Sequence, residues 1–388
     1  MPNLLSRAGL METVRRSVQR HPVTLLVGPR QCGKTTLARE LARGSRTTFF
    51  DLEDPETPLR PEQAKQVLAP LRGLVVIDEF QRQPHLFEVI RVLADRRPLA
   101  ARFLILGSAS PSLVRGASET LAGRVARCDM AGFDLAEIPR ARHTALWIRG
   151  GFPKAFLARS DRASIDWRKA FVQTFLERDL PQLGVHVPAP TLRRAFMMLA
   201  HYHGQLWNGA ELARALGTSE TAARHYLDVL AGAFMLRQLP PWFENVGKRL
   251  VKAPKIYLRD SGILHTLLGL ETRLQVLAHP KLGASWEGFA LDQAIRLMNA
   301  EHDAYFYRTH AGAELDLLVQ RRGKRYGFEF KHADAPRVEK SMRVALDDLA
   351  LEHLFVVHPA ERCYPLHDRI SVVPLAELPQ TVRRHKLA

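Results

Sequence analysis

Cysteine is scarce in this 388-residue sequence, with only three copies, Cys32, Cys128 and Cys363. They lie too far apart for the spacing of a zinc site, and an odd number fits a reducing compartment better than a disulfide-bonded secreted domain. The sequence also lacks any apolar run near the roughly 18 residues that a membrane-spanning helix needs. Residues 1–22 show no signal-peptide pattern, because arginines interrupt every apolar stretch. We therefore expect a cytoplasmic protein with no membrane partner.

Acidic residues are in short supply as well. The chain has 56 Lys and Arg against 40 Asp and Glu, which gives a formal net charge of +16. This excess favours a polyanionic partner, with nucleic acid ahead of an anionic membrane, and scattered charge on an ordinary soluble protein is the alternative. The sequence has no internal repeat, and its length fits two or three domains.

The stretch "GPRQCGKT" at residues 28–35 has the spacing of a phosphate-binding loop. A short apolar run, 23–27, precedes it and a helix-forming segment follows, so the context predicts strand, loop and helix. In such a loop Lys34 reaches the β- and γ-phosphates of ATP, and the Thr35 hydroxyl holds Mg²⁺. The candidate nucleotide-binding residues here are Gly28, Pro29, Arg30, Gln31, Cys32, Gly33, Lys34, Thr35 and Thr36.

The stretch "GLVVIDEFQ" at residues 73–81 predicts a buried strand that ends in two acids. Asp78 suits the coordination shell of Mg²⁺, and Glu79 is placed to polarise an attacking water. Two solvated acids at a strand end would be the plain alternative, but the phosphate loop upstream favours the catalytic interpretation. The next predicted strand, in "RFLILGSAS", ends at Ser108, which is a candidate contact for the γ-phosphate or the water.

A catalytic arginine is the remaining part that phosphoryl transfer calls for, and it is often supplied by a neighbouring subunit. The segment "SETLAGRVARC" offers Arg124, and Arg115 precedes it. We expect Arg124 to act across an ATP-promoted homo-oligomer, with a hexamer as the favoured form. Arg115 in the same role, or an ordinary surface charge, is the alternative.

The motifs "GPRQCGKTT", "LVVIDEFQ", "LILGSAS" and "LAGRV" resemble, in this order, those of the AAA-family ATPases. Three further stretches, "IRGGFPKAF", "TFLERDLPQLG" and "KIYLRDSGILHTLLG", resemble prokaryotic ATPases that join an AAA-type domain to a winged helix and a restriction-endonuclease-like domain. The resemblance covers nearly the whole chain and implies an α/β fold. It implies an AAA-type P-loop core over residues 1–136, a helical lid over 137–188, a winged helix over 189–270 and the endonuclease-like α/β domain over 271–388.

The middle of the chain predicts helices, followed by a winged helix that would bind DNA. Residues 137–185 have helical spacing, which suits a lid over the nucleotide or a plain helical linker. Residues 209–230 predict two helices around Gly217, followed by two strands joined through a basic stretch. These two strands would form the wing of a winged helix, and its basic residues would bind along a phosphate backbone. The same sequence pattern also fits a solvated charged face or a protein-binding module. The candidate DNA-binding residues are Arg224, Lys248, Arg249, Lys252 and Lys255.

Few of these residues can read bases, so we expect recognition of branched or single-stranded DNA by structure rather than by sequence. The pair His201 and His203 cannot share one face of a helix, and a solvated helix end is expected there in place of a metal site.

The stretch "GAELDLLVQRRGKRYGFEFKHAD" at 312–334 predicts two strands that bring Asp316, Glu329 and Lys331 together. This pattern resembles the D-x(n)-E-x-K arrangement of restriction-endonuclease-like nucleases, including those related to archaeal Holliday-junction resolvases. The resemblance adds Glu287 on the preceding helix and implies an α-β-β-β-α-β order. It also implies that Glu287, Asp316 and Glu329 hold Mg²⁺ or Mn²⁺ while Lys331 positions a water.

Two classes of function remain open from the sequence. One is an ATP-driven DNA-processing enzyme whose C-terminal domain cuts DNA. The other is a non-cutting ATP-dependent switch or clamp, in which the nuclease-like fold only binds DNA or a protein.

Overall fold

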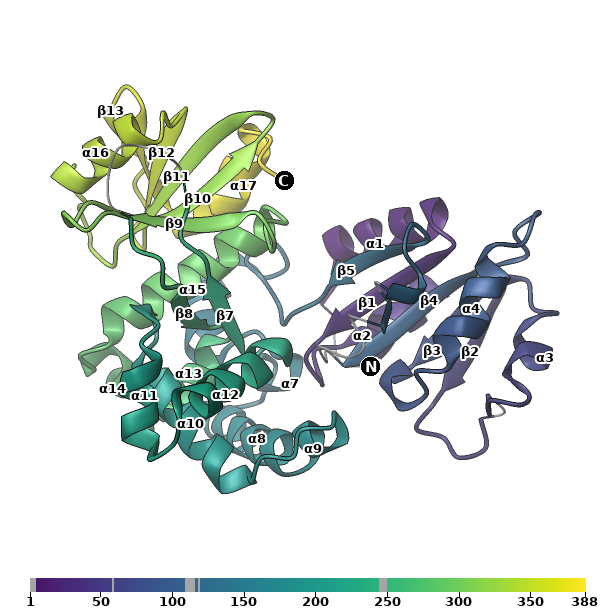
Figure 1. The fold of residues 1–388 in the computed structure, drawn as a ribbon. Helices are drawn as coiled ribbons and strands as arrows, with labels where there is room; N and C mark the ends of the chain where they lie inside the picture. Colours follow the sequence, from purple (N-terminus) through teal and green to yellow (C-terminus); the bar gives the residue numbers. More distant parts are fainter. Residues whose placement is uncertain (1–4, 58, 109–115, 118, 244–249) are drawn as a thin grey trace. The chain divides into compact units, whose positions relative to one another are not determined.

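The computed structural model describes residues 5–57, 59–108, 116–117, 119–243 and 250–388. The chain divides into two compact units, which Figure 1 shows as ribbons. The first unit contains residues 1–132, 178–185 and 232–234. The second contains residues 133–177, 186–231 and 235–388. Within the described ranges, no helix combines the length and the apolar character that crossing a bilayer requires.

A parallel sheet of five strands forms the centre of the first unit. Its strand order is β2-β3-β4-β1-β5. The strands are β1 (Val23–Gly28), β2 (Thr47–Asp51), β3 (Gly73–Asp78), β4 (Ala101–Ser108) and β5 (Val125–Asp129). Because β4 lies between β1 and β3, the ends of the loop-bearing strand and the acidic strand meet on either side of Ser108.

Helices cover both faces of this sheet, which explains why β1 is buried along its whole length. The residues Leu26, Val76 and Leu104 pack in one cluster with the helices α1 (Ala8–Arg20) and α2 (Lys34–Leu41). Their strand neighbours point to the opposite face, where they pack with α3 (Ala64–Leu68) and α4 (Leu86–Ala94). The expected N-terminal α/β domain with a parallel sheet is therefore confirmed.

The second unit begins with a set of helices. They are α6 (His143–Arg149), α7 (Pro153–Phe156), α8 (Asp161–Thr174) and α10 (Ala189–His201). A π-helical turn, Phe175–Asp179, and α9 (Leu180–Gln182) connect α8 toward α10. Residues 178–185 of this connection belong to the first unit, so the region expected to be a lid is shared between the two units.

Two helices and a small antiparallel sheet follow. Gly217 takes the left-handed conformation, φ 67°, and separates α11 (Gly209–Leu216) from α12 (Glu220–Gly232). The sheet has the order β6-β8-β7, with β6 (Gln205–Leu206), β7 (Leu236–Leu239) and β8 (Lys255–Leu258). His203 packs under this sheet, where its Nδ1 accepts a hydrogen bond of 3.0 Å from the Leu258 N–H. The expected solvated position is therefore wrong for His203, which is buried, while His201 is exposed.

The C-terminal part of the second unit is a mixed sheet of order β13-β14-β12-β11-β10-β9. Its strands are β9 (Ala304–Arg308), β10 (Glu314–Arg321), β11 (Lys324–Phe330), β12 (His353–His358), β13 (Tyr364–His367) and β14 (Ile370–Pro374). The helices α15 (Leu282–Leu297), α16 (Lys340–Asp348) and α17 (Leu378–Arg384) pack on this sheet, and α13 (Ser261–Leu267) and α14 (Arg273–Ala278) pack against α15. From α15 to β12 the elements follow the succession α-β-β-β-α-β.

Candidate functional site

The phosphate loop lies between β1 and α2, and its glycines are required by the backbone. A Cβ atom on Gly28 would lie 2.0 Å from the carbonyl oxygen of Met130, so no larger residue fits there. Gly33 has φ 100°, a conformation that side chains disfavour. The following helix points its free N–H groups toward the loop, which suits an anion.

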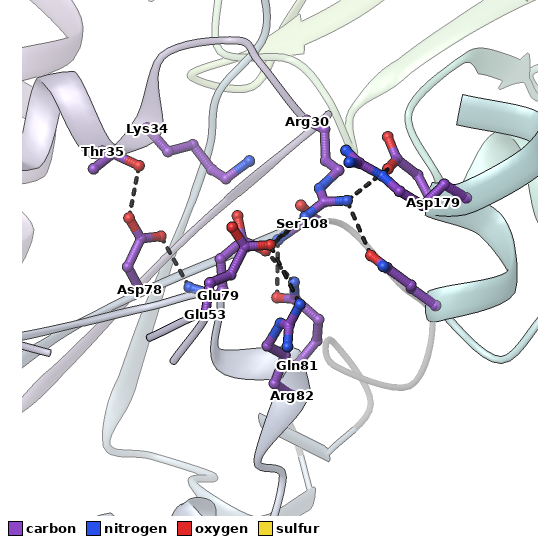
Figure 2. A network of polar contacts seen from close by, with 12 residues as sticks. Arg30, Lys34, Thr35, Glu53, Asp78, Glu79, Gln81, Arg82, Ser108 and Asp179 are labelled. Carbon is purple, nitrogen blue, oxygen red and sulfur yellow. Dashed lines mark hydrogen bonds and ion pairs between the residues drawn. The ribbon is translucent and has the colours of Figure 1, made fainter. Parts of the chain in front are cut away.

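Lys34 is nearly buried, at 5% exposure, and its ammonium group stays within the loop. Its Nζ donates hydrogen bonds of 3.0 Å to the Gly28 carbonyl and 2.9 Å to the Pro29 carbonyl. These acceptors are neutral, so anionic phosphate oxygens would be stronger partners for the same ammonium group. Among the described residues, no carboxylate forms an ion pair with Lys34, which is held within the loop by these carbonyls (Figure 2).

Thr35 and Asp78 join the loop to the end of β3. The Thr35 hydroxyl donates to Asp78 Oδ2 at 2.6 Å, and the other carboxylate oxygen accepts the Glu79 N–H at 2.9 Å. Burial raises the pKa of Asp78, whose side chain is 3% exposed, although the Thr35 hydrogen bond acts in the opposite direction. A hydroxyl and a carboxylate oxygen side by side are the hard ligands that Mg²⁺ prefers, so these two residues fit the ion.

Glu79 directly follows Asp78 in the chain. It is held by Gln81, a residue that the sequence analysis did not predict as part of the site. Its backbone is left-handed, φ 52°, and burial raises the pKa of its carboxyl group. Gln81 donates its side-chain amide to Glu79 Oε2, while its Oε1 accepts the backbone N–H of Ser108 at 3.1 Å. Gln81 therefore connects the candidate catalytic base to the end of β4.

The first unit contains a cavity of about 280 Å³, and Gln81 and Ser108 form part of its wall. The Ser108 Oγ is buried and has no hydrogen-bond partner among the described residues, so its hydrogen-bonding capacity is not used by the protein atoms described here. The cavity is lined by Arg30, Gln81, Arg82, Ser108, Asp179, Gln182 and Leu183.

Arg30 of the loop forms part of the cavity wall, and its side chain binds residues of the segment 178–185, as Figure 2 shows. Its guanidinium forms contacts of 2.5 Å with Asp179, 3.1 Å with Gln182 and 2.7 Å with Glu53. It also lies 3.8 Å from Glu79. The sequence predicted Arg30 only as a loop residue, because a contact between residues 149 positions apart leaves no local signal.

The other expected nucleotide contacts differ in their exposure. Gln31 and Thr36 are exposed, whereas the Cys32 side chain is buried with its Sγ 3.9 Å from the Met130 carbonyl oxygen. Only the backbone of Cys32 is therefore placed to serve a phosphate group.

Arg124 directly precedes β5, whose first residue pairs with Val23 at the start of β1. The phosphate loop follows the other end of β1, so Arg124 and the loop lie at opposite ends of these strands. Its guanidinium forms a bidentate pair with Asp95 at 2.6 and 2.9 Å. Arg124 therefore does not reach the nucleotide site of its own chain, and Arg115 lies outside the described residues.

A second lysine–carboxylate cluster forms in the C-terminal sheet, as the spacing of Asp316, Glu329 and Lys331 predicts. Lys331 Nζ lies 3.7 Å from Glu329 Oε2 and 3.4 Å from Glu339 Oε1. Burial and the nearby Asp316 raise the pKa of Glu329 well above its ordinary range. For the same two reasons the pKa of Glu287 on α15 rises to about 7.

The cluster also contains an unexpected member. Lys255 of β8 is buried, at 4% exposure, and its Nζ lies 2.5 Å from Glu314 Oε1 and 3.3 Å from Asp316 Oδ1. Within the described ranges, no three His, Cys, Asp or Glu side chains converge closely enough to hold a metal ion. As they lie, Glu287, Asp316 and Glu329 do not form the expected set of metal ligands.

The burial of Lys255 also changes what we expect of the predicted DNA-binding residues. Lys255 cannot lie along a phosphate backbone, because it is buried against two carboxylates, so that expectation is wrong. Lys252 is exposed, and Arg224 is exposed with Asp228 as its ion-pair partner at 3.2 Å. Lys248 and Arg249 lie outside the described residues.

Comparison with known proteins places these sites in context. An AAA domain family matches residues 20–139, the range that carries the phosphate loop, Asp78, Glu79 and Ser108. Two domains of unknown function, DUF8612 and DUF4143, match residues 141–274 and 282–378. The N-terminal part is thus an AAA-type P-loop domain, and this supports an ATPase-like function for the chain.

Two relatives extend the comparison to almost the whole chain. They are the uncharacterized proteins Rv2008c of Mycobacterium tuberculosis and Mb2031c of Mycobacterium bovis. Each is 50% identical over 375 residues, covering 97% of this chain and 85% of the relative. The chain belongs to their family.

Solved structures are more distant. The Walker-type ATPase paby2304 of Pyrococcus abyssi is 15% identical with a TM-score of 0.49, covering 69% of this chain and 96% of that protein. The DNA clamp loader delta protein YqeN of Bacillus subtilis is 12% identical with a TM-score of 0.26, covering 57% of this chain and 88% of that protein.

Proposed function

We propose that the protein binds ATP with Mg²⁺ at the phosphate loop and hydrolyses it. Lys34 binds the β- and γ-phosphates, the Thr35 hydroxyl and the Asp78 carboxylate hold the ion, and Glu79 orients and polarises the attacking water. The bound ion would neutralise charge on the phosphates. The observation that carries the proposal is the 2.6 Å contact between Thr35 and Asp78, which joins the loop to the acidic strand in a buried site.

Substitution of the loop lysine tests this proposal directly. Lys34→Ala should abolish binding of a fluorescent ATP analogue and ATP hydrolysis, because no described neighbour can replace its ammonium group between the Gly28 and Pro29 carbonyls. Lys65→Ala, on the separate helix α3, is the control and should keep both. Full ATPase activity in Lys34→Ala would refute the assignment.

We further propose that the ATPase cycle acts on DNA, preferably branched or single-stranded. The net charge of +16 and the exposed Lys252 and Arg224 support a polyanionic partner. Binding to labelled fork, four-way, duplex and single-stranded DNA should weaken steeply with salt, and Lys252→Glu should weaken all of them alike. Equal, salt-independent binding to every DNA would contradict this part.

Assembly into an ATP-promoted homo-oligomer, with a hexamer as the favoured form, belongs to the same proposal. Arg124 is the residue on which this part rests: it does not reach the nucleotide site of its own chain, so a catalytic role for it requires the site of a neighbouring subunit. Sedimentation with a non-hydrolysable ATP analogue should show a larger species. If the protein stays monomeric under these conditions, the role of Arg124 in a neighbouring site is wrong.

A Mg²⁺- or Mn²⁺-dependent nuclease in the C-terminal domain is the second candidate. It is favoured by Asp316, which contributes to the raised pKa of both Glu287 and Glu329, and by Lys331 beside Glu329. If it is correct, wild type should cleave at least one DNA with either metal, and Lys331→Ala should bind that DNA without cleaving it.

A further inference from the structure

We infer that Lys255 is the resident cation of the C-terminal acidic cluster, and that it takes the place a divalent metal would need. The inference bears on the second candidate function and does not depend on ATP hydrolysis. If it is right, the C-terminal domain does not cleave DNA with carboxylate-bound metal, and the alternative of a non-cutting switch or clamp is favoured.

The first observation is the position of Lys255 relative to the acids of β10. Its Nζ contacts Glu314 Oε1 at 2.5 Å and Asp316 Oδ1 at 3.3 Å, so one ammonium group bridges two carboxylates. Glu314 and Asp316 share one face of the strand because side chains alternate along it. The cation therefore lies on the face from which Asp316 would have to offer an oxygen to a metal.

The second observation is that the remaining oxygens of these carboxylates also have donors. Asp316 Oδ2 accepts the backbone N–H of Phe330 at 3.1 Å, and Glu314 Oε2 lies 3.4 Å from the Arg308 guanidinium. A metal ion would have to replace donors that the protein already supplies. Its positive charge would also be placed beside a buried ammonium group, which is strongly unfavourable in a site with little water.

The third observation is that Lys255 is fixed by its surroundings. It pairs with Leu206 on one side and Leu239 on the other, in the central strand of the β6-β8-β7 sheet. Its ammonium group lies 5.4 Å from the centre of the Phe306 ring, a favourable cation–π arrangement. A side chain held in this way has no exposed position to which it can withdraw while β8 stays paired.

The fourth observation concerns the other acids. Glu329 is 4% exposed and has Lys331 at 3.7 Å, so it too has a lysine of the chain as a neighbour. No three carboxylates in the described part of the chain converge on one point. Lysines thus contact Asp316 and Glu329, two of the three acids that the resemblance assigns to a metal.

Metal binding without nucleotide tests the inference. Isothermal titration and Mn²⁺ electron paramagnetic resonance should detect no Mn²⁺ at this cluster in wild type. Lys255→Met keeps the length of the side chain and removes its charge, and it should gain a site at least about tenfold tighter than any in wild type. Asp316→Asn in that background should abolish the new site. Lys324→Met is the matched control, because Lys324 pairs with Glu352 on the surface of the same sheet, and it should gain nothing.

Thermal melting provides a readout that does not require catalysis. Lys255→Met should melt at a lower temperature than wild type, and Mn²⁺ should restore the melting temperature in this variant but not in wild type. If Lys255→Met does not fold, the double variant Lys255→Met with Glu314→Gln removes one of the two carboxylates that have lost the lysine and serves the same test. ATPase activity, measured in parallel, should stay at the wild-type level and reports separately on the nucleotide site.

Two results would overturn the inference. One is Mn²⁺ binding to wild type without nucleotide that disappears in Asp316→Asn, which would show that Lys255 and a metal share the cluster. The other is a folded Lys255→Met, or double variant, that neither binds Mn²⁺ nor is stabilised by it.

Discussion

The two lysine–carboxylate sites of this chain use similar side chains in opposite ways. In the first unit, Lys34 donates to the neutral carbonyls of Gly28 and Pro29, and Asp78 is bonded to the Thr35 hydroxyl. In the C-terminal cluster, Lys255 of β8 is bound directly to Glu314 and Asp316 of β10.

The difference shows what decides whether such a site can accept a ligand. A lysine bound to carbonyls still has its charge available for phosphate, and a carboxylate bound to a hydroxyl still has its charge available for Mg²⁺. Where the lysine and the carboxylates neutralise each other, neither charge is available. Residue types alone are therefore a poor guide, and the partner of each charge is the informative feature.

The largest expected effect is on ATP turnover, and it should distinguish Glu79 of the nucleotide site from Glu329 of the C-terminal cluster. Glu79→Gln removes the candidate base while keeping its shape, so kcat for ATP should fall by about 10²–10⁴-fold with ATP binding retained. Glu329→Gln makes the same change in the C-terminal cluster and should leave ATP turnover unchanged. Steady-state ATPase assays with a filter-binding measurement check both, and equal activity in Glu79→Gln and wild type would remove the base role.

The two buried lysines should differ next in their contribution to stability. Lys255→Ala leaves two carboxylates without their cation, and breaking a buried ion pair in this way costs about 3–5 kcal/mol of unfolding free energy. Lys34→Ala leaves only carbonyl groups without a donor, for which about 1–3 kcal/mol is expected. Urea unfolding followed by circular dichroism compares them, and a larger loss for Lys34→Ala would contradict the contrast.

A smaller effect is expected at Gln81, which holds Glu79 in place. Gln81→Leu removes the donor to Glu79 and the acceptor for the Ser108 N–H, so kcat should fall by about tenfold while KM for ATP changes little. The pH profile of kcat should shift as well, because the Gln81 hydrogen bond lowers the pKa of Glu79. Gln83→Leu is the control, since no described hydrogen bond reaches its Oε1. A rise in KM alone would point to a nucleotide contact in place of a positioning role.

The smallest effect should appear in the pH dependence of stability. Burial raises the pKa of Glu287 to about 7, above its ordinary value of 4.5. A raised pKa means that the folded state favours the protonated form, so this contribution to stability is complete below the ordinary value and is lost as pH rises through about 7. Glu287→Gln should flatten this fall in urea-midpoint measurements across that range, and an unchanged slope would show that other groups cause it.

The parts of the fold that sequence reasoning predicted are those encoded by neighbouring residues. The loop from Gly28 to Thr35 is one continuous motif, and its strand and helix follow from the adjoining residues. The turn at Gly217 between two helices was likewise a local signal, which the left-handed φ of 67° confirms.

Contacts between distant segments were missed because nothing local encodes them. Lys255 lies in a basic stretch without acids, and a surface position was the natural inference; its partner Asp316 is 61 residues away. The Arg30–Asp179 contact and the burial of His203 under β8 are of the same kind. The winged-helix, nuclease-like and oligomer assignments stay predictions.

The most direct test of the contrast is the number of Mn²⁺ ions bound per chain in the presence of a non-hydrolysable ATP analogue, measured by electron paramagnetic resonance. The account predicts one ion, held with the nucleotide by Thr35 and Asp78, lost in Lys34→Ala and kept in Asp316→Asn. A second ion that disappears in Asp316→Asn would contradict the account of the C-terminal cluster, and the absence of any nucleotide-dependent ion would contradict the account of the ATPase site.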